Sequence, residues 1–252
     1  MLTFNGIVSF SETPRNSLMW AHYADQHNGM CIGYKKDVLE HLKDDDDIKE
    51  LPFEITIKEP RKINYDNLRF ESDHYFESNY EQLGREATIK HLLKKSDEWI
   101  YEKEHRCIIP YIKANYLLVT KRNATVDHKY TPTKEVSCLN VGMPYQIIIK
   151  NSLHEKDILK TKTPNLYKIN PETADSVSCA ILQLSKDAFH LVSINKESIH
   201  SIYFGCNVSN SVIKKYYDKL QGKYPIYKFE LSKKRFELIP TLMTEEKLNS
   251  KD

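Results

Sequence analysis

Two separate stretches of the chain carry side chains that are capable of chemistry. In the later one, Glu102, Glu104 and Arg106 alternate along the sequence. Successive side chains of a strand point to opposite faces, so these three groups share one face if the stretch is a strand. Arg106 could then pair with Glu104 or bind a phosphate, because a guanidinium makes paired hydrogen bonds with either partner. Such an arrangement fits a polar site.

The earlier stretch begins with Ser9 and Ser11 and continues into the segment 17–24. That segment holds a tryptophan, a histidine and a tyrosine, namely Trp20, His22 and Tyr23. Few parts of the sequence bring hydroxyl, imidazole and aromatic groups so close together. We expect this stretch to face residues 99–106, with the rest of the chain forming the sheet that holds both.

Each of these residues also has an ordinary structural interpretation. Glu102, Glu104 and Arg106 could form a solvated strand face with a cross-strand ion pair that contributes little to stability. The two tryptophans are more often core anchors than ligand platforms. A histidine such as His22 is about as often a core residue bonded to a backbone carbonyl as a site residue. The two serines could simply end a strand. The coincidence of polar and aromatic residues in two otherwise apolar stretches favours a site.

Composition narrows the class of protein. The chain has 252 residues, 40% of them hydrophobic, so it can bury a sizeable core without a disulfide or a metal. Lys and Arg number 37 and Asp and Glu number 35, which gives a formal net charge of +2. A nucleic-acid-binding domain usually shows a strongly basic footprint. The small net charge therefore argues against a strongly basic nucleic-acid-binding domain, but it does not exclude a local basic groove.

The five cysteines indicate a reduced compartment. They lie far apart and form no Cys-x-x-Cys pair: Cys31, Cys107, Cys138, Cys179 and Cys206. Disulfide frameworks and zinc sites need tighter grouping, so we expect no metal site. No segment has the character of a secretory signal or the length of a membrane span. We therefore expect a soluble, cytoplasmic protein that does not contact a membrane.

Hydrophobic periodicity predicts an α+β fold. Apolar runs predict strands at residues 7–10, 30–34, 55–57, 63–65, 107–109 and 202–205, and a closing hairpin of 225–231 and 236–239. Apolar positions at helical spacing predict helices at residues 17–24, 37–42, 80–95 and 210–220. The helices are too few and too irregular for a doubly wound fold, so we expect a mostly antiparallel or mixed sheet with a few flanking helices.

The pattern along the chain predicts a single α+β domain over residues 1–240. Between residues 113 and 173 the signal weakens to scattered polar residues and turn pairs, which indicates a variable insertion. The charged residues 241–252 are predicted to form a flexible tail.

Three groups of residues carry a resemblance to a known family. They are Ser-Phe-Ser at 9–11, Met-Trp-Ala-His-Tyr-Ala-Asp-x-His-x-Gly-x-Cys-Ile-Gly at 19–33, and a later set of Lys95, Trp99, Tyr101, Glu102, Glu104 and Arg106. Together they resemble a bacterial family catalogued as domain of unknown function 2971. The resemblance covers roughly residues 5–112 and 180–240.

Members of that family usually begin with a further segment upstream of the Ser-Phe-Ser strand. It has a strand with Tyr and His, a helix and an Asn-Asp-Pro-Phe-Glu stretch. The resemblance therefore implies that this segment is truncated here, was excluded by a misassigned start codon, or is supplied by another chain.

The order of a Ser-x-Ser strand followed by a Glu-x-Glu stretch is similar to that of ADP-ribosyltransferases, and implies a split fold of that type. In those enzymes a glutamate bonds a ribose hydroxyl and stabilises an oxocarbenium-like state as nicotinamide leaves, as in carboxylate-assisted glycosyl cleavage. The resemblance implies that Glu104 is the catalytic acid and Glu102 the second carboxylate. His22 is the third catalytic candidate.

The same resemblance implies NAD as a co-substrate and a protein or nucleic acid as the acceptor. Ser9 and Ser11 would orient the glutamate, Trp20 or Tyr23 would stack on a ring, and Arg106 would contact Glu104 or a phosphate. The implied activity is that of an NAD-consuming transferase or glycohydrolase, in a toxin or phage-defence effector.

Two alternatives stay open from the sequence. One is a binding module whose aromatic residues hold a nucleotide or a nucleic-acid strand without chemistry. The other is an N-terminally truncated, inactive member of the family.

Overall fold

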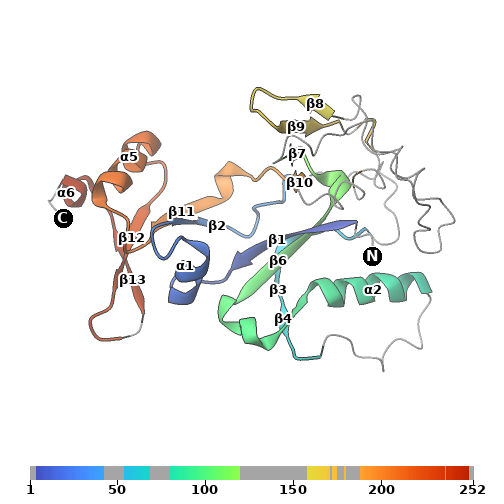
Figure 1. The fold of residues 1–252 in the computed structure, drawn as a ribbon, viewed down its shortest axis with the longest axis horizontal. Coiled ribbons are helices and arrows are strands. Elements are labelled where there is room, and N and C mark those ends of the chain that lie inside the picture. The colour runs from blue at the N-terminus through green and yellow to red at the C-terminus, as the bar shows by residue number, and fades with distance from the viewer. Residues whose placement is uncertain are drawn as a thin grey trace, which may run out of the picture.

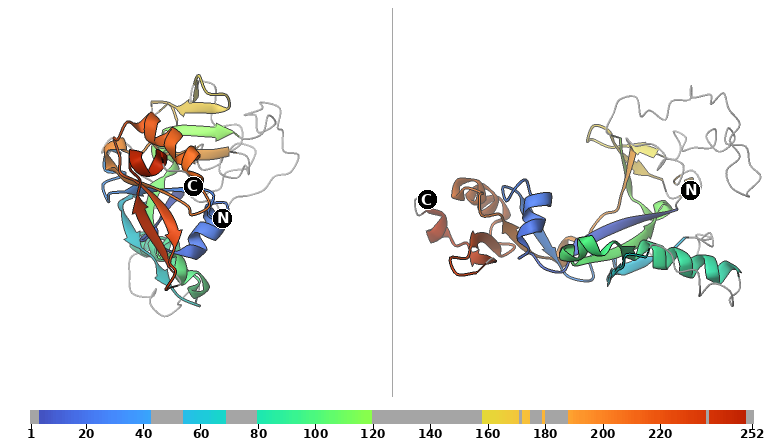
Figure 2. Two further views of the ribbon diagram at one scale, coloured as in Figure 1. Left: turned by 90° about the vertical axis from the view of Figure 1, so that its left-hand side faces the viewer. Right: turned by 60° about the horizontal axis from the view of Figure 1, so that its bottom comes forward.

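The computed structural model of the protein describes residues 4–42, 54–68, 80–119, 158–170, 172–174, 179, 188–235 and 237–249. Within these ranges the chain forms three open sheets of three or four strands and a fourth sheet of two short strands, with helices packed against the larger sheets (Figure 1). The sheet of β11 (Ile199–Phe204), β12 (Ile226–Leu231) and β13 (Leu238–Leu242) lies at one end of the long axis (Figure 1). The sheet of β1 (Asn5–Ser11) and β6 (Glu104–Pro110) lies with that of β7 (Tyr116–Val119) and β9 (Leu166–Ile169) at the other end. The right view of Figure 2 shows the same elongated arrangement.

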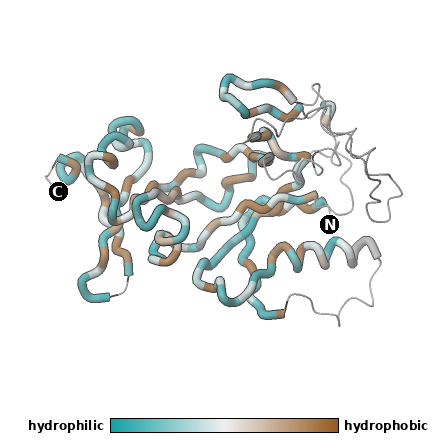
Figure 3. The backbone as a smooth tube through the Cα atoms, viewed as in Figure 1, coloured by the Kyte–Doolittle hydropathy of each residue, from teal (hydrophilic) through white to brown (hydrophobic). Residues whose placement is uncertain are grey.

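The central sheet is antiparallel and holds the two stretches that the sequence singled out. Its strands lie in the order β1 (Asn5–Ser11), β6 (Glu104–Pro110) and β3 (Ile57–Lys62). β6 lies in the middle, which explains why its run Cys107–Ile109 is apolar and buried. Hydrophobic residues follow the paired strands β1 and β6 in Figure 3.

Both faces of the central sheet are covered. Helix α2 (Tyr80–Leu92) packs Ile89 and Leu92 against Ile57 and Ile108 on one face. On the other face, Val38, Leu39 and Leu42 pack against Cys107 and Ile109. The end of the sheet that α2 leaves uncovered carries the polar residues described below.

The C-terminal sheet is mixed. Its order is β13 (Leu238–Leu242), β12 (Ile226–Leu231), β11 (Ile199–Phe204) and β2 (Met30–Tyr34), and only the pair β11 and β12 is parallel. Helices α5 (Asn210–Leu220) and α6 (Glu245–Asn249) cover one face, where Ile213 and Leu248 are buried. Helix α1 (Ser17–Tyr23) packs Trp20 against Phe229 on the opposite face.

The third sheet is antiparallel, in the order β10 (Ala188–Leu191), β7 (Tyr116–Val119), β9 (Leu166–Ile169) and β8 (Ile158–Lys160). Two short parallel strands, β4 (Asn64–Tyr65) and β5 (Lys94–Lys95), lie beside the central sheet. The 3-10 helices are η1 (Asp97–Glu102), η2 (Tyr111–Lys113) and η3 (Lys196–Ser198).

A close approach of two loops holds α1 beside the C-terminal sheet. After α1 the chain turns through Asp25, Gln26 and His27, all with positive φ. Gly205, at the end of β11, lies so close that a Cβ atom there would be 2.0 Å from the carbonyl oxygen of His27. Only glycine fits this position, and its N–H donates to the carbonyl of Gly29 at 3.1 Å.

The predicted fold class is confirmed: the structure is α+β, with antiparallel and mixed open sheets and a few flanking helices. The helix predicted at residues 37–42 is wrong. The N–H of Glu40 donates to the carbonyl of Asp37, and that of Leu42 donates to the carbonyl of Leu39. Both bonds span three residues, whereas those of an α-helix span four, so the segment forms successive turns. Its apolar residues still face the core.

The division into domain, insertion and tail stays a prediction. The described part of the predicted insertion contains β7, β8 and β9, in which Leu117 and Ile169 are buried. The predicted tail contains the end of β13 and all of α6.

Candidate functional site

Strands β1 and β6 bring the two stretches together, as the sequence predicted. They pair so that Ser9 lies opposite Arg106 and Ser11 lies opposite Glu104. Residues directly opposite on paired strands point to the same face. Both serines and both charged side chains therefore lie on one face of the central sheet.

The carboxylate of Glu104 is buried and saturated with hydrogen bonds. The residue is 5% exposed. Its Oε1 accepts from Ser9 Oγ at 2.5 Å and from Arg106 Nε at 2.7 Å. Its Oε2 accepts from Arg106 Nη2 and Lys95 Nζ, each at 3.1 Å.

This environment fixes the charge of Glu104. Burial raises the pKa of its carboxyl, but the hydrogen bonds from Arg106, Ser9 and Lys95 outweigh burial and bring the pKa to about 2. Glu104 is therefore an anion at neutral pH and does not donate a proton.

The ammonium of Lys95 joins Glu104 to a second buried carboxylate, that of Glu102. Lys95 Nζ donates to Glu102 Oε2 as well as to Glu104. Glu102 is 4% exposed. Burial opposes the charge of Lys95, but its bonds to the two carboxylates outweigh burial, and the pKa of Lys95 is raised.

The prediction that Glu102, Glu104 and Arg106 share one strand face is wrong for Glu102. That residue ends the 3-10 helix η1, and β6 begins two residues later. Between them Lys103 has a left-handed backbone, with φ of 47°. Although one carboxylate ends η1 and the other begins β6, both reach the ammonium of Lys95.

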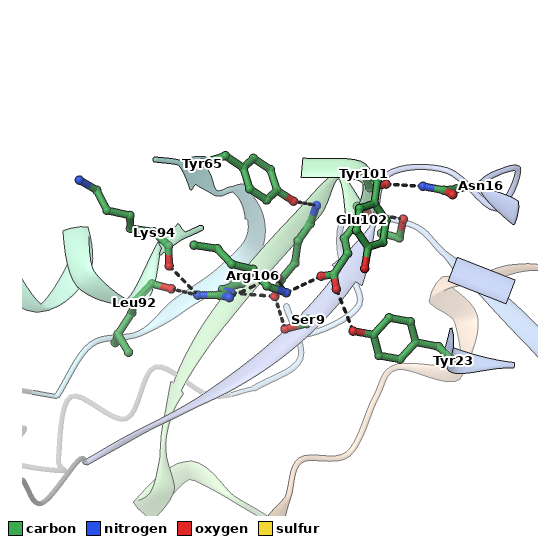
Figure 4. A network of polar contacts seen from close by, with 12 residues as sticks. Ser9, Asn16, Tyr23, Tyr65, Leu92, Lys94, Tyr101, Glu102 and Arg106 are labelled. Atoms are coloured by element: carbon green, nitrogen blue, oxygen red, sulfur yellow. Dashed lines mark hydrogen bonds and ion pairs between the residues drawn. The ribbon is translucent and has the colours of Figure 1, made fainter. Parts of the chain in front are cut away.

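Helix α1 connects to this cluster at both of its ends. At its start, the Asn16 side chain accepts from the N–H of Leu18 at 3.0 Å and donates to the carbonyl of Tyr101. At its end, the Tyr23 hydroxyl donates to Glu102 Oε1 at 2.8 Å (Figure 4). The helix thus holds η1 against the end of β1.

A row of aromatic rings leads from the cluster to the surface. The centroid of the Tyr101 ring is 5.9 Å from that of Trp99 and 6.2 Å from that of His22, and His22 is 6.5 Å from Tyr23. Lys95 Nζ lies 5.0 Å from the Trp99 ring, within cation–π range. Trp99 is 40% and Tyr23 63% exposed, so flat apolar surface adjoins the buried charges.

Trp20 lies in the core and not in this row. Its ring meets that of Phe229 edge-on, with centroids 5.3 Å apart, and its indole N–H donates to the carbonyl of Pro14 at 2.6 Å. Because Trp20 is buried, it has no free face for a ligand ring. The interpretation of this tryptophan as a core anchor agrees with its position.

The remaining predicted residues take different positions. Ser11 donates to the backbone carbonyl of Glu102 at 2.8 Å and not to a carboxylate, so it orients the main chain. His22 is exposed, and within the described residues it makes ring contacts only.

Three residues of the cluster were not among the predicted site residues: Lys95, Asn16 and Tyr65. The hydroxyl of Tyr65 accepts the backbone N–H of Glu104 at 2.8 Å. Lys95 was part of the family motif, and that motif was the only signal for it. The roles of all these residues in a reaction stay predictions.

The charges of the cluster balance, since two carboxylates meet one ammonium and one guanidinium. Arg106 Nη1 also donates to the carbonyl of Leu92 at 2.5 Å, so its guanidinium is fixed. Groups arranged in this way can hold hydroxyls and positive charge, and cannot supply a proton from Glu104.

Across the described ranges, no group of three or more His, Cys, Asp or Glu side chains is placed to hold a metal ion. Among the helices described, none combines the length and the apolar character that crossing a membrane requires.

One family model matches the chain. It is described as "Protein of unknown function (DUF2971)" and matches residues 19–107. The match runs from α1 into β6 and contains Tyr23, Lys95, Glu102, Glu104 and Arg106, whereas Ser9 lies outside it. No curated protein and no solved structure matches the chain.

Proposed function

We propose, from the match of residues 19–107 to the model of the family of unknown function DUF2971 and from the geometry of the site, that the chain is an NAD-consuming enzyme. In this proposal the enzyme cleaves the bond between nicotinamide and ribose and transfers the ADP-ribosyl group to a macromolecule or to water. The carboxylate pair Glu102 and Glu104 is its active site.

One observation carries the proposal: two buried carboxylates share the ammonium of Lys95 beside exposed aromatic rings. Burying four charged groups is expensive, and replacing such a network by apolar residues is often neutral or stabilising. A buried ionic cluster that opens onto a surface is therefore a candidate functional site.

The charge state of Glu104 favours nicotinamide as the leaving group. Cleavage of an ordinary O-glycoside needs a carboxylic acid that protonates the leaving oxygen. With a pKa of about 2, Glu104 is not that acid. Nicotinamide carries a positive charge on its ring nitrogen in NAD and leaves as a neutral molecule, so its departure needs no proton.

The structure favours Glu102, and not Glu104, as the carboxylate that touches the substrate. Four donors occupy the oxygens of Glu104. Among the described residues only Tyr23 and Lys95 donate to the carboxylate of Glu102, and Tyr23 is exposed. Glu102 can therefore accept a hydrogen bond from a ribose hydroxyl, while Glu104 positions Lys95.

The aromatic row supplies the surface for the rings of NAD. Trp99 and Tyr23 are the exposed members nearest to the carboxylates. Stacking a heterocycle on such side chains contributes about 1–3 kcal/mol.

The test is release of nicotinamide from NAD by the purified chain and by Glu102→Gln. The variant keeps the size of the side chain and removes its charge, so we expect release to fall by about 100-fold or more, as for loss of one preorganised transition-state contact. Glu98→Gln is the matched control, because Glu98 is an exposed glutamate of the same 3-10 helix. We expect its rate to equal that of the wild type.

Absence of release from the folded wild-type chain would contradict the proposal. If the chain then still bound NAD, with equal affinity in wild type and Glu102→Gln, the aromatic row would be a nucleotide-binding module without chemistry.

A further inference from the structure

The phenol of Tyr23 lies where the buried charges meet the surface. Its side chain ends α1 and is 63% exposed, while its hydroxyl donates to the 4% exposed Glu102 at 2.8 Å. The other oxygen of that carboxylate accepts from Lys95. The reactive oxygen of Tyr23 is thus held against a buried base while its ring stays accessible.

This arrangement has the form of an activated nucleophile. In such sites a nucleophile lies within hydrogen-bond reach of a base, and a third group orients the base. Tyr23, Glu102 and Lys95 fill these positions in that order. Lys95 is itself held by Glu104 at 3.1 Å, so the base has little freedom to turn away.

We propose that Tyr23 is a modification site of this chain, at which its phenolic oxygen accepts the ADP-ribosyl group from NAD. This inference rests on the proposed function and names the acceptor of the reaction.

The step balances in atoms and charge. The phenolic oxygen of Tyr23 attacks C1′ of the nicotinamide ribose, and its proton passes to Glu102. The bond between C1′ and the nicotinamide nitrogen breaks, and its electron pair neutralises the ring nitrogen. The products are O-(ADP-ribosyl) tyrosine, free nicotinamide and one proton, which Glu102 returns to solvent.

The proton must move during the attack and not before it. The hydrogen bond to Glu102, together with burial and the negative charge of Glu102, raises the pKa of Tyr23, so the phenol is neutral at rest. Proton transfer to Glu102 then makes the oxygen nucleophilic only when an electrophile is present.

Ser9 makes a similar contact with Glu104 but is a poorer acceptor. Its hydroxyl donates to Glu104 at 2.5 Å. That carboxylate also accepts from Arg106 and Lys95, and its pKa of about 2 makes it a weak base. Tyr23 is therefore the hydroxyl beside the less occupied carboxylate, since among the described residues only Tyr23 and Lys95 donate to Glu102.

The test is incubation of the full chain with NAD, followed by peptide mass spectrometry for ADP-ribose and by assay of free nicotinamide. We expect the adduct on Tyr23. Tyr23→Phe should lose the adduct and release nicotinamide more slowly, because water must replace the phenol. Tyr216→Phe is the matched control, since Tyr216 is an exposed helical tyrosine that contacts Phe204 instead of a carboxylate. It should keep both signals unchanged.

The outcomes separate this inference from the proposed function. Nicotinamide release without an adduct on Tyr23, or an adduct that persists in Tyr23→Phe, overturns the acceptor role and leaves NAD cleavage standing. Absence of both signals from the folded chain overturns both proposals.

Discussion

At the scale of single residues, the chain holds four charged side chains in mutual contact at one end of the central sheet. The contact of Arg106 with Glu104 could be predicted, because alternation along one strand places both side chains on the same face. The contact of Ser9 with Glu104 was implied only by the resemblance to ADP-ribosyltransferases. The ion pair between Lys95 and Glu102 could not be predicted from the sequence. It depends on the left-handed backbone of Lys103, a conformation that no local pattern predicts for lysine.

The low pKa of Glu104 predicts a specific dependence of stability on pH. Its pKa falls from 4.5 to about 2 on folding, so the native state is stabilised above pH 4.5 and loses this contribution as the pH falls towards 2. By linkage the contribution is roughly 3 kcal/mol at pH 7. Glu104→Gln removes it, so the variant should be less stable than the wild type by about this amount at pH 7 and by much less near pH 2.

Urea unfolding of the two proteins at pH 7 and at pH 2.5 measures these differences. Glu98→Gln, on the exposed side of η1, should match the wild type at both pH values. An equal gap between wild type and Glu104→Gln at the two pH values would show that the ion pairs of Glu104 do not stabilise the fold.

At the scale of elements, α1 positions the site. It buries Trp20 against Phe229 of the C-terminal sheet and presents Tyr23 to Glu102 beside the central sheet. Periodicity predicted this helix at 17–24, close to the observed Ser17–Tyr23. Its ties to η1 were not predicted, because Asn16 is an ordinary turn residue in sequence and its second partner, the carbonyl of Tyr101, is distant along the chain.

Asn16 should therefore matter more than an ordinary helix cap. Asn16→Ala removes the cap from α1 and its bond to η1, and we expect a loss of roughly 1–2 kcal/mol in the free energy of unfolding. The matched control is Ser209→Ala, because Ser209 precedes α5 without a side-chain cap hydrogen bond and should lose less than about 0.5 kcal/mol.

Denaturant unfolding measures the stability of both variants. The rate of nicotinamide release shows whether loss of the Asn16 hydrogen bonds also disturbs the geometry of the site. If Asn16→Ala were no less stable than Ser209→Ala, the tie between α1 and η1 would be energetically unimportant.

At the scale of the whole molecule, the α+β class and the strand at residues 107–109 could be predicted, since both follow from short apolar runs and from the small number of helices. The division into separate sheets could not be predicted, because sheet order depends on pairings between distant strands. The strands β2 and β11, for example, are adjacent in the C-terminal sheet although more than 160 residues separate Tyr34 from Ile199 along the chain.

Helix α6 packs against the rest of the C-terminal part through one leucine. The segment 241–252, predicted to be a flexible tail because it is rich in charged residues, contains α6, whose Leu248 is 6% exposed and packs with Ile213 and Met243. A single leucine among charged residues gives no periodic signal, so its burial could not be predicted.

If α6 belongs to the folded unit, removing its one buried side chain should destabilise the whole molecule. Leu248→Ala should lower the free energy of unfolding by about 2 kcal/mol, near the lower end for a buried leucine because α6 has only five residues. Leu231→Ala is the matched control, since Leu231 is 67% exposed at the end of β12 and should change stability by less than about 0.5 kcal/mol. Thermal unfolding of both variants decides the question, and equal melting temperatures would mean that residues 245–249 do not contribute to the stability of the C-terminal sheet.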